Sequence, residues 1–369
     1  MIITRTPFRV SFFGGGTDYH TWYQEHGGAA LSTSINHYCY LTCRNLPPFF
    51  KHNSRVVWSK IEEIKDHIEV EHPVVNAVLK YLNIDQGVEI HHQGDLPAHS
   101  GLGSSSSFTV GLLNALYAMQ GIMSTKKQLA CEAVHVEREI LKENVGVQDQ
   151  IATAYGGFNK IDIQKNGQFN VQPVVLPQKR LEELQSHLML FFTGISRISS
   201  QVAGEQMKAI PKKQMELHHM HMMVEEAVDI LSQGKDICDF GRLLDESWSL
   251  KRSLSNKISP ELVDEVYEAA KQAGAYGGKL LGAGGGGFIL LFAKPEDQPQ
   301  VMKALSSLLL VPFQFETAGS QIIFCDKPSY TESGLARRNF VHLEKQNKNV
   351  TKAHLQKLQE NRKSSLTVL

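Results

Sequence analysis

The stretch from Asp95 to Ser107 holds the densest group of residues able to bind an anion. It reads Asp-Leu-Pro-Ala-His-Ser-Gly-Leu-Gly-Ser-Ser-Ser-Ser, and it lies between a predicted strand over 87–91 and a predicted helix over 108–119. Glycines let a backbone approach a ligand closely, and unpaired N–H groups at the start of a helix favour a phosphate. The pattern therefore predicts a phosphate site, and an ordinary helix capped by one serine is the alternative.

Two further glycine-rich segments carry side chains that suit a polar ligand. The loop Gly14-Gly15-Gly16-Thr17-Asp18-Tyr19 combines an open backbone with one carboxylate, which can accept hydrogen bonds from neighbouring sugar hydroxyls. A hairpin turn is the alternative for that loop. The segment Lys279 to Phe292 contains the spacing Gly-x-Gly-x-x-Gly, but an apolar strand follows it instead of a helix. That context excludes a dinucleotide-binding fold at this loop.

Two isolated carboxylates stand near the first of these loops in the sequence. Glu137 lies on a predicted helix over 125–144, and Asp149 precedes the apolar start of the next helix. An acidic residue at a helix start also stabilises the helix dipole. From the residues alone, both a structural and a catalytic role remain open for Asp149.

The elements that must position these residues fall into two groups. Strands are predicted over 2–13 and 30–44 and a short helix over 74–82, whereas a strand over 188–192 and helices over 199–254 follow a polar join at 173–186. The three glycine-rich segments are spread across both groups. We therefore expect a site shared between two domains.

The composition excludes several classes of function. The 369 residues include 38 basic and 38 acidic side chains, so the formal net charge is zero and nothing points to nucleic acid as a partner. No apolar run approaches the length needed to cross a bilayer, and we expect a cytoplasmic protein without membrane insertion. Cys39 and Cys43 beside His37 could form a corner of a metal site, but no fourth ligand is suitably spaced, so buried thiols are favoured.

The motifs resemble one family of enzymes. Gly-Leu-Gly-Ser-Ser lacks the lysine of a Walker A loop, and the protein-kinase motifs are missing. Over about residues 1–327 the chain instead resembles the GHMP family of small-molecule kinases, such as galactokinase, homoserine kinase and mevalonate kinase. The matching segments are Pro7–Val10, Thr17–Tyr19, Pro97–Ser105, Gly146–Gln150 and Lys279–Phe288.

The resemblance implies an α+β fold of two domains with ATP in the cleft between them. The N-terminal domain would be of the ribosomal-S5-domain-2-like type and the C-terminal domain ferredoxin-like. We place the N-terminal ATP-binding and catalytic domain at 1–180, the C-terminal domain at 186–327 and a basic polar tail at 328–369.

The implied reaction is phosphoryl transfer from ATP to an alcohol group. In such a reaction the protein mainly positions the reactants and neutralises the charge of the phosphates. Asp149 would accept or orient the proton of the attacking hydroxyl, and Arg9 would offset charge on the transferring group. Ser105 and Glu137 would hold Mg²⁺, a hard cation. The implied ATP-binding residues are Pro97, Gly101, Leu102, Gly103, Ser104, Ser105 and Ser106, and the implied substrate-binding residues are Gly15, Gly16, Thr17, Asp18, Tyr19, Arg197, Gly284 and Gly285.

The first glycine-rich loop bears on the substrate. Galactokinases carry Glu-His before Thr-Asp-Tyr, where this sequence has Gly15-Gly16, which leaves room for a longer or already phosphorylated sugar. The loop and Phe192–Arg197 resemble D-glycero-D-manno-heptose 7-phosphate kinases, which implies phosphorylation of the anomeric hydroxyl to the 1,7-bisphosphate. Arg197 would then bind the substrate's own phosphate.

Two other functions stay open at this point. One is a kinase for an unphosphorylated hexose, fucose or galactose, and the other is a non-catalytic regulator that binds sugar and ATP. In every case the expected partner is a small-molecule sugar or sugar phosphate. A second copy of the chain, in a homodimer, is a further candidate partner.

Overall fold

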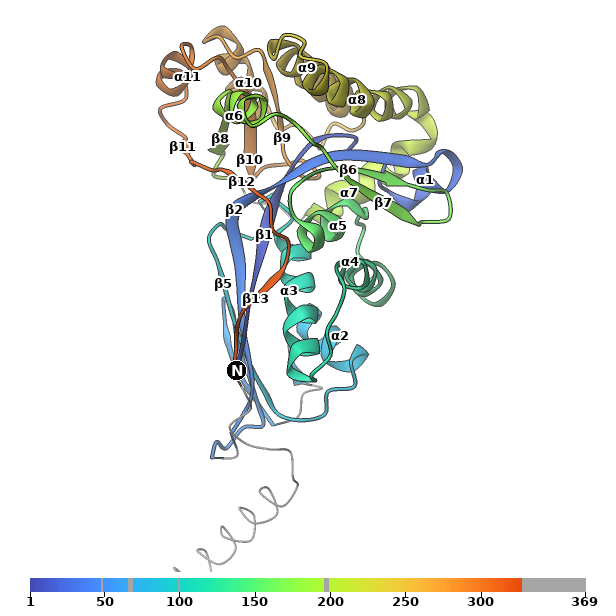
Figure 1. Cartoon of the computed structure of the whole chain (residues 1–369), viewed down its shortest axis with the longest axis vertical. Helices are drawn as coiled ribbons and strands as arrows, with labels where there is room; N and C mark the ends of the chain where they lie inside the picture. Colours follow the sequence, from blue (N-terminus) through green and yellow to red (C-terminus); the bar gives the residue numbers. More distant parts are fainter. Residues whose placement is uncertain (48, 66–68, 99, 196–198, 327–369) are drawn as a thin grey trace, which may run out of the picture.

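The computed structural model describes residues 1–47, 49–65, 69–98, 100–195 and 199–326. They form two sheets with helices packed against them (Figure 1). Two long strands run along the larger sheet, and the smaller sheet lies at one end of it together with most of the C-terminal helices. The predicted two-domain α+β fold is confirmed.

The larger sheet is built on β1 (Ile2–Phe13) and β2 (Gly28–Asn45). They pair antiparallel from Ile2 opposite Cys43 to Phe13 opposite Leu31, with register shifts after Pro7 and after Ser11. Such bulges bend a strand and increase its twist. The remaining strands from the first half of the chain are β3 (Ser54–Val57), β4 (Ile61–Ile64), β5 (Val88–Gly94), β6 (Phe158–Ile163) and β7 (Phe169–Pro173), and among their pairings only that of β3 with β5 is parallel in the ranges that the structure describes.

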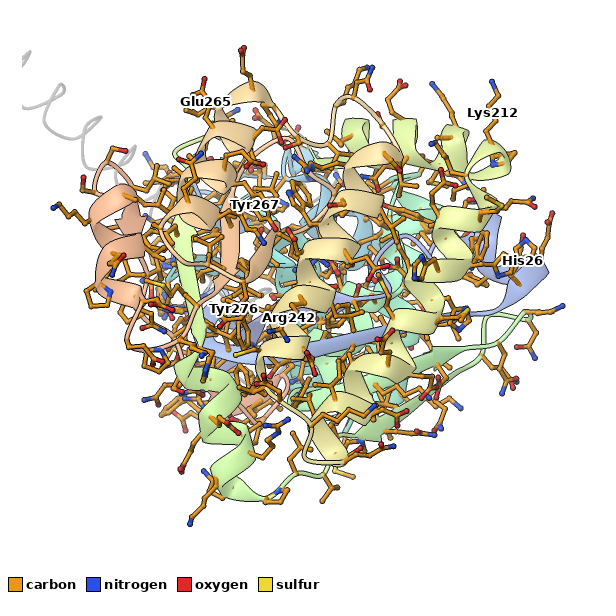
Figure 2. All side chains as sticks on the ribbon, turned by 90° about the horizontal axis from the view of Figure 1, so that it is seen from above. His26, Lys212, Arg242, Glu265, Tyr267 and Tyr276 are labelled. Atoms are coloured by element: carbon orange, nitrogen blue, oxygen red, sulfur yellow. The ribbon has the colours of Figure 1, made fainter. Side chains whose placement is uncertain are left out.

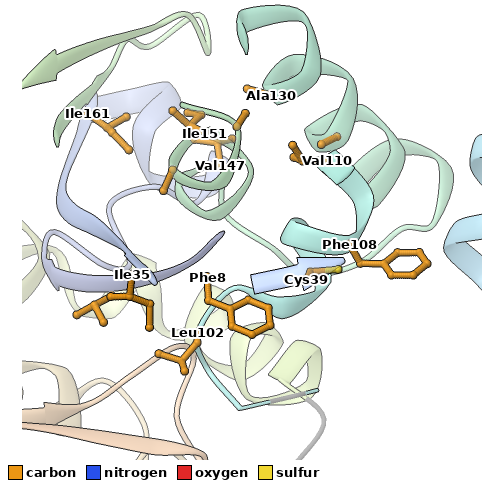
Figure 3. Close-up of a cluster of buried hydrophobic side chains, with 14 of the residues drawn as sticks. Phe8, Ile35, Cys39, Leu102, Phe108, Val110, Ala130, Val147, Ile151 and Ile161 are labelled. Carbon is orange, nitrogen blue, oxygen red and sulfur yellow. The ribbon is translucent and has the colours of Figure 1, made fainter. Parts of the chain in front are cut away.

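The helix that follows the predicted phosphate loop is packed tightly on β1. A Cβ atom added to Gly111 would lie 2.8 Å from the Thr6 hydroxyl oxygen, so only glycine allows this approach. Apolar residues such as Phe8, Val110 and Ile151 fill the space between sheet and helices (Figure 3). The helices of this half are α1 (His20–His26), α2 (Pro73–Tyr81), α3 (Ser104–Met119), α4 (Lys126–His135) and α5 (Gln148–Tyr155).

The helix predicted over 125–144 is interrupted. α4 ends at His135 and continues as a π-helical turn, η2 (Val136–Ile140), after which Lys142 adopts a φ of 56°. The wider π turn changes the direction in which its side chains point, and such turns are frequent at functional sites. Here it carries Glu137, which is fully buried.

The smaller sheet has the strand order β11-β8-β10-β9 and is antiparallel throughout. α9 lies directly on β9, because a Cβ atom on Gly277 would be 2.1 Å from the Gly241 carbonyl oxygen. On the outer side, Arg242 of α9 lies over the Tyr276 ring (Figure 2). The elements are α6 (Gln178–Ser186), β8 (Leu188–Phe192), α7 (Ser199–Ala209), the 3₁₀ turn η3 (Ile210–Lys212), α8 (Gln214–Ser232), α9 (Cys238–Ser253), α10 (Glu261–Gln272), β9 (Gly277–Leu280), β10 (Phe288–Phe292), α11 (Gln298–Ala304) and β11 (Leu309–Leu310).

The last described strands return to the larger sheet. β12 (Phe315–Glu316) pairs with β2, and β13 (Gln321–Cys325) pairs antiparallel with β1. The predicted domain boundaries assign these residues to the C-terminal domain over 186–327. Their backbone hydrogen bonds place them in the larger sheet. The strands β1 and β13 lie more than 300 residues apart in the chain, and pairing over such a separation leaves no signal in the local sequence. The predicted tail over 328–369 lies outside the described residues.

The described part of the chain contains neither a candidate membrane-spanning helix nor a candidate metal cluster. No helix there is long and apolar enough to cross a membrane. All five cysteines are free thiols, and Cys39 and Cys43 are buried on β2. No group of three His, Cys, Asp or Glu side chains that could hold a metal ion occurs among the described residues.

Candidate active site

A cleft lies where the three glycine-rich segments meet. Its volume is about 1160 Å³, including the open mouth. Both halves of the chain contribute, because Arg9 and Asp149 from the first half line it together with Lys251 and Lys279 from the second. The other lining residues are Ser11, Gly15, Gly16, Asp18, Tyr19, Gly101, Gly103, Ser104, Ser105, Ser106, Glu137, Glu143, Asn144, Val145, Gly146, Gln148, Ala203, Gln206, Gly282 and Ala283.

The predicted phosphate loop leads into α3 with its backbone in the left-handed region. Gly101 and Gly103 have φ values of 81° and 75°, and Gly103 is the N-cap residue, with no side chain to occupy the first N–H groups of the helix. The start of α3 therefore has no side-chain cap, and Gly103 to Ser106 line the cleft, as an anion site requires. Leu102 is fully buried and Pro97 is exposed, so these two predicted residues shape the loop without lining the cleft.

The four serines at the start of α3 point in different directions. The hydroxyl of Ser107 donates to the carbonyl oxygen of Pro7 at 2.9 Å, which ties the helix to β1. Ser106 is buried and donates to Glu137 at 3.1 Å. Ser104 is partly exposed and Ser105 exposed at the cleft wall. Of the four hydroxyls, one therefore ties the helix to β1, one binds the Glu137 carboxylate, and two lie at the cleft wall.

The third glycine-rich segment supports the phosphate loop from behind. A Cβ atom on Gly282 would lie 2.5 Å from Gly101 Cα, and one on Gly287 would lie 2.2 Å from the Ser100 carbonyl oxygen. Gly284 and Gly285, which we predicted to bind substrate, pack on Ile258, whose carbonyl oxygen accepts from the Gly285 N–H at 2.8 Å. From this loop, Gly282 and Ala283 line the cleft.

Replacing Gly101 by alanine tests this contact between the two loops. A Cβ atom there would be 2.4 Å from the Leu281 carbonyl oxygen, and the φ of 81° is itself strained for alanine. We expect Gly101→Ala to cost at least about 1–3 kcal/mol of stability and to raise KM for ATP. Gly121→Ala is the matched control, because Gly121 has a φ of 75° with nothing within 4 Å. Equal melting temperatures for the two variants would contradict the tight packing.

Asp149 and Arg9 form a two-bond ion pair on the cleft wall. Arg9 donates from Nε to Asp149 Oδ1 at 2.8 Å and from Nη2 to Oδ2 at 2.6 Å. Its Nη1 donates to the Gly101 carbonyl oxygen at 2.7 Å. The Arg9 side chain is 3% exposed and that of Asp149 33%, so the carboxylate remains open to the cleft. Arg9 therefore joins the carboxylate to the phosphate loop through one rigid guanidinium.

Asp18 is held by backbone donors, and its carboxylate interacts with the charge of Asp149. Its carboxylate accepts from the N–H of Gly16 at 3.0 Å and of Gln148 at 3.3 Å. Burial, and after it the charge of Asp149, raises the pKa of Asp18. A Cβ atom on Gly146 would lie 1.8 Å from Asp18 Oδ2, so this loop must carry glycine where it passes the carboxylate.

The remaining predicted residues of the first loop differ in their surroundings. Gly15, Gly16 and Tyr19 line the cleft together with Asp18. Thr17 is fully buried, and its hydroxyl bonds to the carbonyl oxygens of Gly14 and Ala29 at 2.8 Å each. Thr17 therefore shapes the loop in this structure. The predicted residue Arg197 lies outside the described residues.

Glu137 is a buried carboxylate whose two oxygens differ in their hydrogen bonding. Its Oε2 accepts from Ser106 at 3.1 Å and from Gln150 at 2.5 Å. Its Oε1 has no hydrogen-bond partner within the described ranges. Burial raises the pKa of Glu137 to about 7, and the hydrogen bonds oppose this only in part. A buried carboxylate oxygen beside serine hydroxyls is a donor set that suits a hard cation such as Mg²⁺.

Sequence reasoning missed two lysines in the cleft. Lys251 on α9 and Lys279 on β9 are 5% and 2% exposed. One signal was available for Lys251, because it follows the buried Ser247 and Trp248 along the apolar face of an amphipathic helix. A lysine on such a face is unusual and calls for a partner. Lys279 stood in the third glycine-rich segment, but no role was inferred for its side chain.

The fold and the cleft define a class of enzyme. The N-terminal domain model of the GHMP kinases matches residues 69–157, and their C-terminal model matches residues 224–309. The chain belongs to the GHMP kinase family, and it is an ATP-dependent phosphotransferase with an alcohol group as acceptor.

Among individual proteins, the chain is similar to sugar kinases. It is 28% identical over 321 residues to a D-glycero-alpha-D-manno-heptose 7-phosphate kinase of Campylobacter jejuni, which covers 82% of this chain and 93% of that protein. A crystal structure of a D-glycero-D-manno-heptose 1-phosphate kinase from Bacteroides thetaiotaomicron has a TM-score of 0.71 and 25% identity, covering 89% and 100% of the two chains. An L-fucokinase/L-fucose-1-P guanylyltransferase of Bacteroides fragilis is 24% identical over 82% of this chain and 36% of its own length. The chain is a sugar kinase of this family.

Proposed function

We propose that this kinase phosphorylates the anomeric hydroxyl of D-glycero-D-manno-heptose 7-phosphate, producing the 1,7-bisphosphate and ADP. The observation that carries the proposal is the Asp149 carboxylate, held by Arg9 between the phosphate loop and Asp18. The sugar is inferred from the similarity to the D-glycero-alpha-D-manno-heptose 7-phosphate kinase of Campylobacter jejuni and from the two glycines, Gly15 and Gly16, in the cleft wall.

The residues support a direct transfer. The anomeric oxygen forms a bond to the γ-phosphorus of ATP while the bond from that phosphorus to the ADP oxygen breaks. Asp149 orients the hydroxyl or takes its proton, because a carboxylate bonded twice to Arg9 still has free lone pairs. Arg9 offsets charge on the transferring group and holds Asp149 in place.

We propose that the reaction uses Mg²⁺. Glu137 offers its free carboxylate oxygen, and Ser105 presents an exposed hydroxyl in the same wall of the cleft. When bound, the ion would neutralise charge on the phosphate oxygens of ATP. Phosphates and water would complete its coordination, which fits a site with a single buried carboxylate.

Asp18 is assigned to the sugar. It is buried and fixed by two backbone N–H groups, so its orientation is set before the ligand arrives. Its carboxylate has lone pairs left for the sugar hydroxyls. Arg197, which follows the strand β8 in sequence, remains the predicted partner of the 7-phosphate.

A second candidate function is a kinase for an unphosphorylated hexose. It is favoured by the similarity to fucokinase enzymes, although the chain spans only about a third of their length. The regulator without catalysis is disfavoured, because a sensor has no need for the Asp149–Arg9 pair or for a buried Glu137 with a free oxygen.

A coupled ATPase assay over a panel of acceptors tests the proposal. We expect turnover to be highest with D-glycero-D-manno-heptose 7-phosphate, and phosphorus NMR should place the new phosphate on the anomeric carbon. Highest turnover with fucose or galactose would favour the hexose kinase. ATP binding without turnover on the heptose phosphate, fucose, galactose, mannose or mevalonate would favour the regulator.

A further inference from the structure

The two lysines in the cleft have only backbone oxygens as partners. Lys251 Nζ donates to the Gly282 carbonyl oxygen and lies 3.5 Å from that of Leu280. Lys279 Nζ donates to the Phe12 carbonyl oxygen at 2.6 Å. Across the described ranges of the chain, neither lysine forms an ion pair with a carboxylate. A buried cation in such surroundings costs free energy that an anionic ligand would recover.

The carboxylates in the cleft wall do not take up this charge. Asp149 is paired with Arg9, and Asp18 accepts from two backbone N–H groups. Glu137 lies with Ser106 on the side of the phosphate loop, where Glu143 is also close to it. The lysine side of the cleft is therefore positively charged before any substrate binds.

Lys251 keeps its proton at neutral pH. Burial lowers its pKa to about 8, the charge of Arg9 adds to this, and the charges of Asp18 and Asp149 oppose it. Burial also lowers the pKa of Lys279 well below its usual value, and the charge of Lys251 contributes. Lys251 is thus the lysine whose positive charge is available to an anion at neutral pH.

We propose that Lys251 binds the phosphate that the acceptor sugar already carries. This inference rests on the proposed function and deepens it, because it names a residue, in addition to the predicted Arg197, that would select a phosphorylated acceptor. Lys251 donates to the Gly282 carbonyl oxygen, and the carbonyl oxygen of the next residue, Ala283, accepts from Gln206. Gln206 also contacts Tyr19, which follows Asp18 in the loop assigned to the sugar. The nucleotide end is marked by the loop from Gly101 to Ser106 and already has helix N–H groups for its phosphates.

The cleft has a wall that could hold the far end of such an acceptor. Ala203 and Gln206 of α7 line it beside Tyr19, and Gln206 donates to the Ala283 carbonyl oxygen. Tyr19 in turn donates to Gln206 at 3.4 Å. These contacts join α7 to the loop of Gly282 and Ala283, which also accepts the Lys251 hydrogen bond. Lys251 and this wall therefore belong to the same cleft as Asp149.

The test is kinetic and compares two acceptors. Steady-state rates are measured for the wild type and Lys251→Met with heptose 7-phosphate and with the same heptose without its phosphate. We expect kcat/KM for the phosphorylated sugar to fall by about 10- to 100-fold, as loss of a charge-assisted hydrogen bond predicts, mainly through KM. For the unphosphorylated sugar and for KM of ATP we expect changes below about threefold.

Lys271→Met is the matched control. Lys271 on α10 also donates to a backbone oxygen, that of Tyr276, but it is paired with Asp245 and does not line the cleft. Its kinetics should equal those of the wild type. Equal losses by Lys251→Met on both sugars would assign Lys251 a structural role, and a loss in kcat or in KM for ATP alone would assign it to the transferring phosphate. Either result overturns the inference.

A measurement on the wild type covers the case in which Lys251→Met does not fold. Inorganic phosphate should inhibit competitively against the sugar phosphate and not against ATP. Competition against ATP alone, or no inhibition, would overturn the inference. Failure of the proposed function is distinct, because the wild type itself would then leave heptose 7-phosphate unphosphorylated.

Discussion

Asp149→Asn should lower turnover by about 10²- to 10⁴-fold, the range expected when a positioned acid or base is removed. The amide has the shape of the carboxylate but cannot take a proton from the attacking hydroxyl. Arg9 loses its ionic partner but keeps its bond to the Gly101 carbonyl oxygen, so the phosphate loop stays supported. Calorimetric titration should therefore show ATP affinity within a few-fold of the wild type.

Asp162→Asn is the control for this experiment. Asp162 on β6 is also an ion-paired aspartate, 3.3 Å from Lys160, and its exposure of 35% is close to the 33% of Asp149. It does not line the cleft, and its variant should turn over like the wild type. Near-normal turnover by Asp149→Asn would remove Asp149 from the mechanism.

Glu137→Gln should stabilise the protein in the absence of metal while lowering turnover by at least about 100-fold. The pKa of Glu137 is raised by burial from 4.5 to about 7. The folded state therefore binds more protons than the unfolded state between these values, and stability falls as pH rises from about 4.5 to about 7. Above pH 7 the charged form costs about 3 kcal/mol, which glutamine would not incur.

The measurement is urea unfolding of both proteins at pH 5 and at pH 8 without metal. The gain from Glu137→Gln should be present at pH 8 and small at pH 5. Mg²⁺ with a non-hydrolysable ATP analogue should stabilise the wild type more than the variant. A variant that is less stable at pH 8, or one that retains full Mg²⁺-dependent turnover, would show that Glu137 is a structural carboxylate.

Glu89→Gln gives the opposite sign and serves as the control. Glu89 on β5 is buried, and burial alone would raise its pKa. Hydrogen bonds from Arg44 and His91 outweigh burial and lower the pKa. Its charge therefore contributes stability that is present at neutral pH and lost as pH falls through the folded pKa. Glu89→Gln should destabilise the protein at pH 8 without affecting turnover.

Some of the site could be predicted because its chemistry is local. A segment with glycines, serines and a following apolar helix needs no distant residue to expose N–H groups, so the loop before α3 lies where it was expected. The same holds for the loop that carries Asp18. The limit of local reasoning is visible at Gly284 and Gly285, whose motif position did not reveal that they pack on Ile258.

Helix phase and strand pairing required the tertiary structure. Four consecutive serines look alike in sequence, but packing of α3 on β1 directs Ser107 to Pro7 and Ser106 to Glu137. The π turn that buries Glu137 interrupts a helix whose apolar spacing continues through it. The return of β13 to β1 depends on hydrogen bonds between opposite ends of the described chain.

What the sequence alone determined was therefore the set of chemical groups and the local elements that carry them, because glycine freedom, hydroxyl content and apolar period act over a few residues. The two-domain fold followed from the resemblance to the family. The tertiary structure decided which groups meet. The Arg9–Asp149 pair joins residues 140 positions apart, and Lys251 reaches the cleft only because α9 packs on β9. Such contacts depend on how whole helices and strands pack, which fixes the distances between side chains to about an ångström. A local sequence pattern does not contain this information.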